Sequence, residues 1–199
     1  MIGKAAMFAL GLVVISQSSS PSDADWAWLD EHREEAFDAL MPIASAPGQL
    51  VAYRRYRDLY HDVPEAHFAI GTGERPASGP AKLRAVVTSP TSGSIQQQLL
   101  QLHMTNRDLS LDALLPRVMI QRQTIVEDRC PSLRSRMNAL PRAKIALADP
   151  NIITLHPTVH RFVIETGGAQ IDARLVDSND SVVRWASDTL KALQRCAAG

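Results

Sequence analysis

Short runs in which apolar and polar residues alternate recur along this chain, and they predict a fold built around a β-sheet. Residues 65–72 (EAHFAIGT) and 82–88 (KLRAVVT) each place their apolar side chains on one face, as a half-buried strand does. Residues 50–60 precede them, and the spacing of the tyrosines in this segment fits a helix as well as a strand. Because two strands follow and sequential strands tend to be neighbours, we predict a strand here too. The three segments together predict an antiparallel meander.

The same alternation returns in the last third of the chain. Residues 161–166 and 171–175 flank the pair Gly167-Gly168, which is typical of a two-residue hairpin turn. Further strands are predicted over residues 118–126 and 152–155. The sequence therefore predicts an antiparallel sheet.

Helical patterns lie before, between and after these strands. The clearest is at the C-terminus, where one helical face carries Val182, Trp185, Ala186, Leu190 and Leu193. Its predicted cap is Asp177 or Ser178. Other helices are predicted over residues 23–41 with Ser22 as N-cap, after Ser94, after Ser110 and from Pro131 to Leu140. Strands and helices mixed without regular β-α-β alternation indicate an α+β fold, an antiparallel sheet with amphipathic helices packed on one face.

The first 20 residues have the order of a secretory signal peptide. Lys4 gives a short cationic start, residues 5–15 are small or apolar, and residues 16–20 are mostly small and polar. The apolar run of 11 residues is shorter than the roughly 20 that a membrane-spanning helix needs, so a permanent anchor is the weaker alternative. We predict cleavage after Ser18 or Ser20. The mature chain, residues 21–199, is then a single domain, periplasmic or secreted, without a membrane span.

The chain has two cysteines, Cys130 and Cys196. An exported chain with an even number of cysteines normally pairs them, so we predict a disulfide between these two. The alternative is a redox or catalytic thiol. That chemistry needs a neighbouring cation, histidine or Cys-x-x-Cys partner, and no such motif accompanies Cys130.

Composition restricts the class of ligand. The chain has 21 basic and 21 acidic residues, a balance that argues against binding nucleic acid or anionic lipid through bulk charge. Aromatic residues are 5% of the chain, too few for an extended stacking platform. We therefore expect no nucleic-acid partner.

One pair of histidines has the spacing of a zinc site. His156 and His160 are four residues apart, which on a helix would allow both to reach one metal ion. However, Pro157 interrupts a helix and the flanking residues are strand-like. In a strand the two side chains would lie about 13 Å apart, too far for one zinc ion. We predict no metal site.

Other motifs of catalysis or cofactor binding are incomplete. No G-x-S-x-G turn is present, and the glycines at positions 71 and 73 lack the rest of a dinucleotide-binding loop. The adjacent acids Glu34-Glu35 and Glu127-Asp128 do not oppose each other as the carboxylates of a glycosidase do. We predict no cofactor and name no catalytic residue.

Two stretches are candidates for a surface that binds a partner. The first is the segment YRRYR, with the candidates Tyr53, Arg55, Tyr56 and Arg57. It either grips an acidic partner or packs as an ordinary strand with cation–π contacts. The second is the acidic stretch of residues 23–38, with the candidates Glu31, Glu34, Glu35 and Asp38. This stretch has seven acidic residues, whereas residues 117–144 have seven basic residues. Three alternatives follow: the two stretches pack against each other, they are exposed to water, or one of them binds an oppositely charged partner.

Because no catalytic motif is complete, the sequence favours a non-enzymatic domain that binds another exported protein, in the manner of an inhibitor or immunity protein. Two alternatives stay open. One is a small envelope hydrolase whose active site is assembled from distant segments. The other is a structural or assembly factor of the cell envelope, which exposed sheet edges or a large apolar patch would favour.

Overall fold

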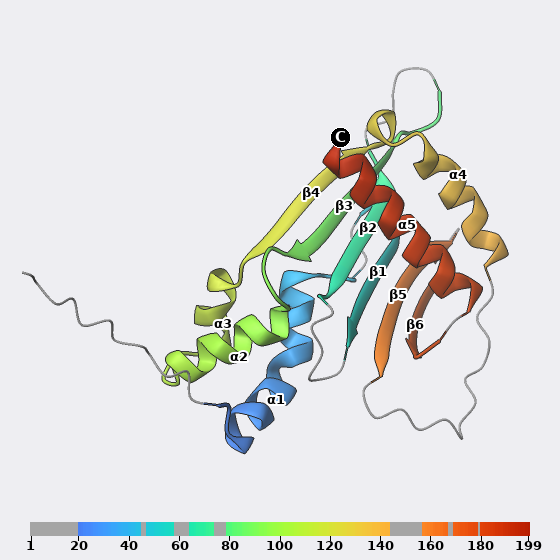
Figure 1. Ribbon diagram of the computed structural model, residues 1–199. Coiled ribbons are helices and arrows are strands. Elements are labelled where there is room, and N and C mark those ends of the chain that lie inside the picture. Colours follow the sequence, from blue (N-terminus) through green and yellow to red (C-terminus); the bar gives the residue numbers. More distant parts are fainter. Residues whose placement is uncertain are drawn as a thin grey trace, which may run out of the picture.

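In the described part of the chain, six strands form one antiparallel sheet at the centre of the fold (Figure 1). The computed structural model describes residues 20–44, 47–57, 64–73, 79–143, 157–166, 169–178 and 180–199. The strands are β1 (Gln49–Arg57), β2 (Ala66–Thr72), β3 (Leu83–Pro90), β4 (Ile120–Val126), β5 (Thr158–Thr166) and β6 (Ala169–Val176). Their order is β4-β3-β2-β1-β5-β6, and all neighbours run antiparallel. The predicted α+β fold with an antiparallel sheet is confirmed.

Three sequence predictions fall on residues that the structure does not describe. They are the signal peptide up to residue 19, the strand over residues 152–155, and the turn at Gly167-Gly168. The other predicted strands are present, and β1, β2 and β3 form the predicted meander. β5 and β6 pair along their whole length, as a hairpin does. β1 joins the two units, because it pairs with β2 on one side and with β5 on the other.

Five α-helices occur within the described residues. They are α1 (Asp23–Leu40), α2 (Ile95–Thr105), α3 (Leu111–Leu114), α4 (Ser132–Ala139) and α5 (Ser181–Ala198), with single 3₁₀ turns at η1 (Leu115–Arg117), η2 (Glu127–Arg129) and η3 (Leu140–Arg142). Ser22 and Ser94 cap α1 and α2 as predicted. In each case the third helical residue, Asp25 or Gln97, bonds back to the N-cap and completes a capping box.

The predicted cap of the last helix is wrong. α5 begins at Ser181 and its N-cap is Asp180. Asp177 is still bound to the sheet, because its N–H donates to the Thr158 carbonyl (2.9 Å) and its carboxylate accepts from the Thr158 N–H (2.7 Å). Asp177, one of the two predicted caps, therefore extends the pairing of β6 with β5 and does not cap α5.

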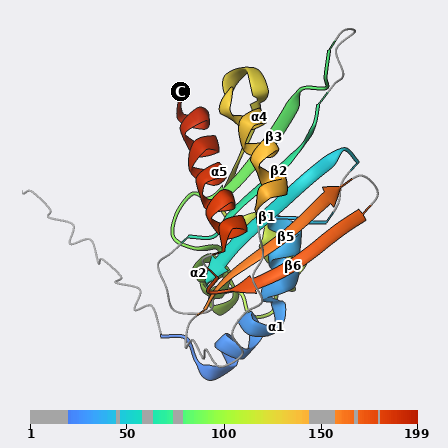
Figure 2. The same cartoon turned by 90° about the vertical axis from the view of Figure 1, so that its right-hand side faces the viewer.

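α5 and α4 cover one face of the sheet. Figure 1 shows α5 lying across the strands, and Figure 2 shows α4 beside it on the same side. The buried stripe of α5 is the predicted one, with Val182, Trp185, Ala186, Leu190 and Leu193 in the core. It packs against Tyr53, Phe68 and Phe162 of the central strands. Each such large side chain contributes about 1.5–3 kcal/mol when it is fully buried.

The predicted disulfide between Cys130 and Cys196 is confirmed. It joins the segment before α4 to the last turns of α5, with the two Cα atoms 5.5 Å apart. The cysteines are 66 positions apart. Closing a loop of that length lowers the conformational entropy of the unfolded chain, which stabilises the folded state by about 4 kcal/mol. The bridge therefore fixes the C-terminal helix to the rest of the domain.

α1 lies against the opposite face of the sheet. The predicted helices on one face are therefore accompanied by a helix on the other face as well. Figure 1 shows α1 and α2 gathered at one end of the sheet. Leu29 and Phe37 of α1, Leu99 of α2, and Tyr56 and Val159 of the sheet form a second core cluster. α1 also meets the sheet through charged groups, and this part of the contact is not visible in the apolar periodicity of the sequence.

Candidate functional site

A row of polar residues crosses the sheet on the face that contacts α1. The strand register places one member on each strand, in the order Arg122, Thr88, His67, Arg54, Arg161 and Arg174. Residues that pair directly across a ladder lie on the same face, so these six side chains share one side of the sheet. We call them the polar row. The row needs hydrogen-bond acceptors and negative charge, and α1 supplies both.

The C-terminal end of α1 is held by three hydrogen bonds from the polar row. The last carbonyls of a helix lack partners within the helix, and a nearby cation is favoured by the helix dipole. The bonds run from Arg122 to the Leu40 carbonyl (2.9 Å), from Arg54 to the Met41 carbonyl (3.4 Å) and from His67 Nε2 to the Pro42 carbonyl (2.8 Å). Three strands thus fix the point at which α1 ends.

Arg54 lies near the centre of the polar row and is fully buried, at 0% exposed. Its guanidinium forms ion pairs with Glu34 (2.9 Å) and Asp38 (2.7 Å) of α1. The Tyr56 hydroxyl donates to Glu34, and Arg54 lies over the rings of Phe37 and Tyr56. A buried charge is costly unless it is paired, so the fold requires these carboxylates. Glu34 and Asp38, two candidates for the partner surface, therefore bind within the chain, although their side chains remain about half exposed.

His67 is the neighbour of Arg54 in the polar row and is 2% exposed. A carbonyl only accepts hydrogen bonds, so His67 Nε2 carries the proton that is donated to Pro42. Its Nδ1 lies 3.4 Å from the Thr88 hydroxyl. Burial lowers the pKa of His67 to about 4, and the nearby charges of Arg54 and Arg122 act in the same direction. The ring is therefore neutral at physiological pH, and both of its nitrogens have partners within the chain.

A second buried polar pair lies on the α5 face. The Tyr53 hydroxyl and His160 Nδ1 share a hydrogen bond of 2.9 Å. Burial raises the pKa of Tyr53 to about 12 and lowers the pKa of His160 to about 4. Tyr53 is 0% exposed and Tyr56 is 2% exposed, so both tyrosines of the YRRYR segment belong to the interior. Arg55 and Arg57 reach the solvent in part.

The predicted absence of a zinc pair falls partly on undescribed residues. His156 lies outside the described ranges, and His160 is bound to Tyr53. Among the described residues, no group of three or more His, Cys, Asp or Glu side chains is arranged to hold a metal ion.

Aromatic stacking joins α1 to α2 in a cluster that sequence reasoning missed. The Trp28 ring is stacked on both His32 and His103, with centroids 4.7 and 4.0 Å away. Asp25 lies 3.7 Å from His103 Nε2 and accepts a hydrogen bond from Arg107 at 3.0 Å. Burial lowers the pKa of His103. Trp28 and His32 lie four positions apart on α1, but His103 and Arg107 come from a separate segment, so no spacing rule along the sequence brings the whole cluster together.

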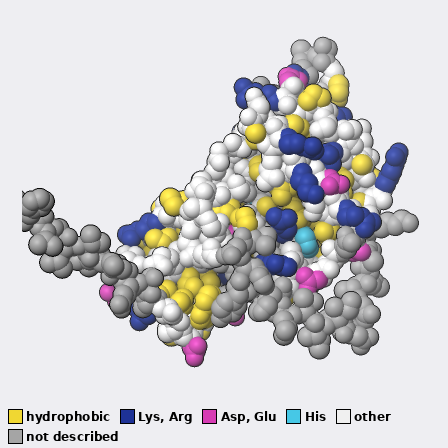
Figure 3. Space-filling model, in the orientation of Figure 1, with side chains coloured by type: hydrophobic (Ala, Val, Ile, Leu, Met, Phe, Trp, Pro, Cys, Tyr) yellow, Lys and Arg dark blue, Asp and Glu magenta, His cyan; other side chains and the backbone are white. Residues whose placement is uncertain are grey.

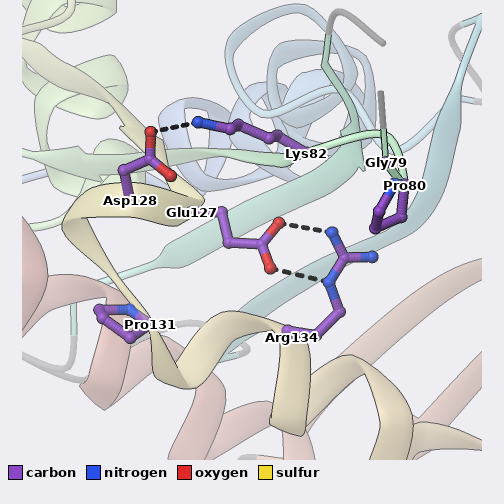
Figure 4. A pocket seen from close by; sticks show the side chains of 7 residues that line it. All are labelled: Gly79, Pro80, Lys82, Glu127, Asp128, Pro131 and Arg134. Atoms are coloured by element: carbon purple, nitrogen blue, oxygen red, sulfur yellow. Dashed lines mark hydrogen bonds and ion pairs between the residues drawn. The ribbon is translucent and has the colours of Figure 1, made fainter. Parts of the chain in front are cut away.

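A surface pocket of about 490 Å³ lies between the start of β3 and the segment around η2 (Figure 4). Its lining residues are Gly79, Pro80, Lys82, Glu127, Asp128, Pro131 and Arg134. Glu127 accepts two hydrogen bonds from Arg134 (2.7 and 2.6 Å), and Lys82 pairs with Asp128 at 2.6 Å. Arg134 holds the pKa of Glu127 below its usual value. The two acids thus bind different bases, and the pocket contains two satisfied ion pairs.

Charge is distributed unevenly over the surface. Figure 3 shows the molecule in the orientation of Figure 1. Lys and Arg side chains gather there over the half of the visible face that α4 and α5 cover. The remaining acidic candidates, Glu31 and Glu35, are exposed on α1. A partner surface that includes these two acids stays a prediction.

β6 forms one outer edge of the sheet, and most of its side chains are exposed. Ile171 and Val176 are 44% and 41% exposed, and the charged Asp172 and Arg174 lie between them. No described strand pairs with the outer side of β6. Figure 2, which views the molecule from this side, shows β6 as the strand nearest the viewer. An exposed edge offers backbone N–H and C=O groups to another chain, so β6 is the candidate binding site.

Comparisons of the chain with protein-family models, with curated proteins and with solved structures found no match. In the part of the chain that the structure describes, none of the helices combines the length and the apolar content needed to cross a bilayer.

Proposed function

We propose that this chain is an exported, non-enzymatic domain that binds another protein through the outer edge of β6. The observation that carries the proposal is the edge itself, a strand of 8 residues with exposed apolar and charged side chains. Strand addition at a free edge is a recurring mode of protein recognition. Backbone hydrogen bonds supply affinity in this mode, and side chains at alternate positions supply specificity.

Export is supported by two features. The first is the order of cationic, apolar and small polar residues at the N-terminus. The second is the disulfide between Cys130 and Cys196, because such bonds persist in oxidising compartments. We therefore place the working protein in the periplasm or outside the cell, where an inhibitor- or immunity-like role towards another exported protein fits the proposal.

The same edge favours a second candidate, a structural or assembly factor of the cell envelope. Assembly by strand pairing uses the same exposed backbone groups as the capture of a single partner. The two candidates differ in what β6 meets, either one defined protein or the repeated units of an assembly.

A photo-reactive residue at position 174 tests the proposed surface. The chain carrying Arg174→benzoyl-phenylalanine is exported with its own N-terminal segment and irradiated in the cells that produce it. Adducts are then identified by mass spectrometry. The matched control carries Thr124→benzoyl-phenylalanine, which places the same group on β4, the opposite edge of the sheet.

We expect a discrete protein adduct from position 174 and none from position 124. Equal labelling at both edges, or no adduct from position 174, would contradict the proposed surface. A single adduct mass supports a defined partner, whereas a ladder of masses supports the assembly role.

A further inference from the structure

The backbone groups of β6 alternate between β5 and the outer side. Asp177, the residue that follows the strand, donates its N–H to the Thr158 carbonyl of β5. Because the direction of these groups alternates along an antiparallel strand, the other odd-numbered residues also turn theirs towards β5. The outward groups therefore belong to the even-numbered residues, which are Gln170, Asp172, Arg174 and Val176.

Two copies of β6 can pair antiparallel about a two-fold axis in three registers near the middle of the strand. In these registers Asp172, Ala173 or Arg174 lies on the axis, opposite the same residue of the second copy. Each places outward residues opposite outward residues, as the hydrogen bonds require. Centring on Asp172 sets two carboxylates directly opposite each other, and centring on Arg174 does the same with two guanidinium groups. Like charges directly opposite each other destabilise a strand pair. Centring on Ala173 instead places each Asp172 opposite Arg174 of the second copy.

The register centred on Ala173 also matches the apolar side chains. Ile171 falls opposite Leu175 of the second copy, and Ala173 falls opposite Ala173 of the second copy. These are the positions without hydrogen bonds, where opposed Cα atoms are about 4.5 Å apart and side chains approach most closely. Ile171 is 44% exposed in the single chain, so this pairing would cover a large apolar side chain on the edge.

We infer that the partner of β6 is β6 of a second copy of this chain, paired antiparallel about a two-fold axis at Ala173. One sheet then runs continuously through both copies. The inference rests on the proposed function, in which β6 is the edge that binds a protein, and it names a second copy of this chain as that protein in place of an unrelated exported one. An interface between identical patches must be self-complementary, and the order Ile171, Asp172, Ala173, Arg174, Leu175 has this property.

The charges on β6 do not have the arrangement that would keep copies apart. Edge strands that resist association carry charges, Lys above all, that disfavour pairing with a second copy. β6 carries one acid and one base two positions apart. Within the single chain Asp172 pairs with Arg161 of β5 (3.4 Å) and Arg174 contacts the Tyr56 hydroxyl, and in the proposed register each also lies opposite the other charge in the second copy. By contrast β4, the other edge, carries Arg122 and no acid, so it offers no opposite charge to a second β4.

Charge-reversal variants distinguish a second copy from any other partner. In the D172R chain, position 172 and Arg174 of the second copy repel each other; in the R174D chain, Asp172 and position 174 do. We expect each variant alone to be monomeric in sedimentation velocity where the parent chain is a dimer. The dissociation constant of the dimer should rise about tenfold or more. A mixture of the two variants restores both opposite-charge pairs, so we expect a heterodimer.

Thermal unfolding of each variant confirms that it is folded, and the T124D chain is the matched control on β4 that should dimerise like the parent. The inference is overturned by a parent chain that is monomeric at every concentration, by single variants that still dimerise, or by a mixture that stays monomeric while the parent is a dimer. If the chain is monomeric and position 174 labels a different protein, the proposed function stands and the inference fails. If the parent chain is monomeric and position 174 labels nothing, both fail.

Discussion

The centre and the outer end of the polar row contain the same kinds of side chain in opposite environments. Arg54, on β1, is 0% exposed and is neutralised within the chain by Glu34 and Asp38. Arg174, on β6, is exposed and contacts the Tyr56 hydroxyl, and Asp172, two positions before it, forms an exposed ion pair with Arg161. Arg161 of β5 lies between these two arginines and pairs with both of them in the strand register.

The difference follows from position in the sheet. The polar-row face of β1 lies beneath α1, so a charge there must find its partner within the chain or destabilise the fold. An edge strand keeps unpaired backbone groups on its outer side, and its exposed side chains stay accessible to a partner even where, like Asp172 with Arg161, they also pair within the chain. Substitutions at the centre should therefore change stability, and substitutions at the edge should change association.

The largest effect on stability is expected from removing both partners of Arg54. The E34A/D38A chain leaves a buried guanidinium without a counter-charge, and we expect the free energy of unfolding to fall by about 4 kcal/mol. Urea denaturation measures this loss. The matched control is E31A/E35A, which removes two exposed acids from the same helix and should change stability by no more than about 0.5 kcal/mol. Equal losses in the two variants would break the comparison.

The next effect is a dependence of stability on pH that His67 contributes. Its folded pKa of about 4 lies below the ordinary value of 6.5, so between these values the unfolded chain binds a proton that the folded chain does not. Stability therefore falls as the pH falls from 6.5 to 4, by about 1.4 kcal/mol per pH unit and about 3 kcal/mol in all.

The H67Q chain isolates this contribution, because glutamine keeps an N–H donor for the Pro42 carbonyl but does not titrate. Urea denaturation of both chains across this pH range should show a shallower decline for H67Q. His160 is present in both chains, so its own contribution cancels. Parallel pH curves would show that His67 does not carry this dependence.

The smallest effect on stability is expected at the outer end of the row. Asp172 and Arg161 form an exposed ion pair at 3.4 Å, and such pairs contribute about 0–1 kcal/mol. We therefore expect the D172A chain to unfold within about 1 kcal/mol of the parent under conditions where both are monomeric. Its self-association should weaken at the same time, which analytical ultracentrifugation measures. A large loss of monomer stability would show that Asp172 belongs to the fold and not to an interface.

Most elements of the fold were predictable because their signals are local. Ser22 and Asp25 are close in sequence and form the first capping box, and the apolar stripe of α5 is visible in its spacing. The two cysteines left one intramolecular pairing to predict. The cap of α5 was missed because Asp177 bonds to Thr158, a residue far away in the sequence.

The polar row and the β6 edge were not predictable for the same reason. Polar residues in an alternating strand are normally assigned to solvent, and the register that aligns Arg54 with His67 and Arg161 is a property of the assembled sheet. Burial of Tyr53 and Tyr56 likewise depends on helices that cover both faces. The position of β6 at the edge depends on strand order, which local spacing does not contain.

Cysteine cross-linking at the proposed two-fold axis tests the central claim most directly. In the proposed register, Ala173 lies opposite Ala173 of the second copy at about 4.5 Å between Cα atoms, within the range of a disulfide. The native cysteines are already joined to each other. We expect the Ala173→Cys chain to form a covalent dimer on a non-reducing gel, and the Asp172→Cys and Thr124→Cys chains to stay monomeric. An Ala173→Cys chain that stays monomeric, or equal cross-linking of all three chains, would contradict pairing of two β6 strands about Ala173.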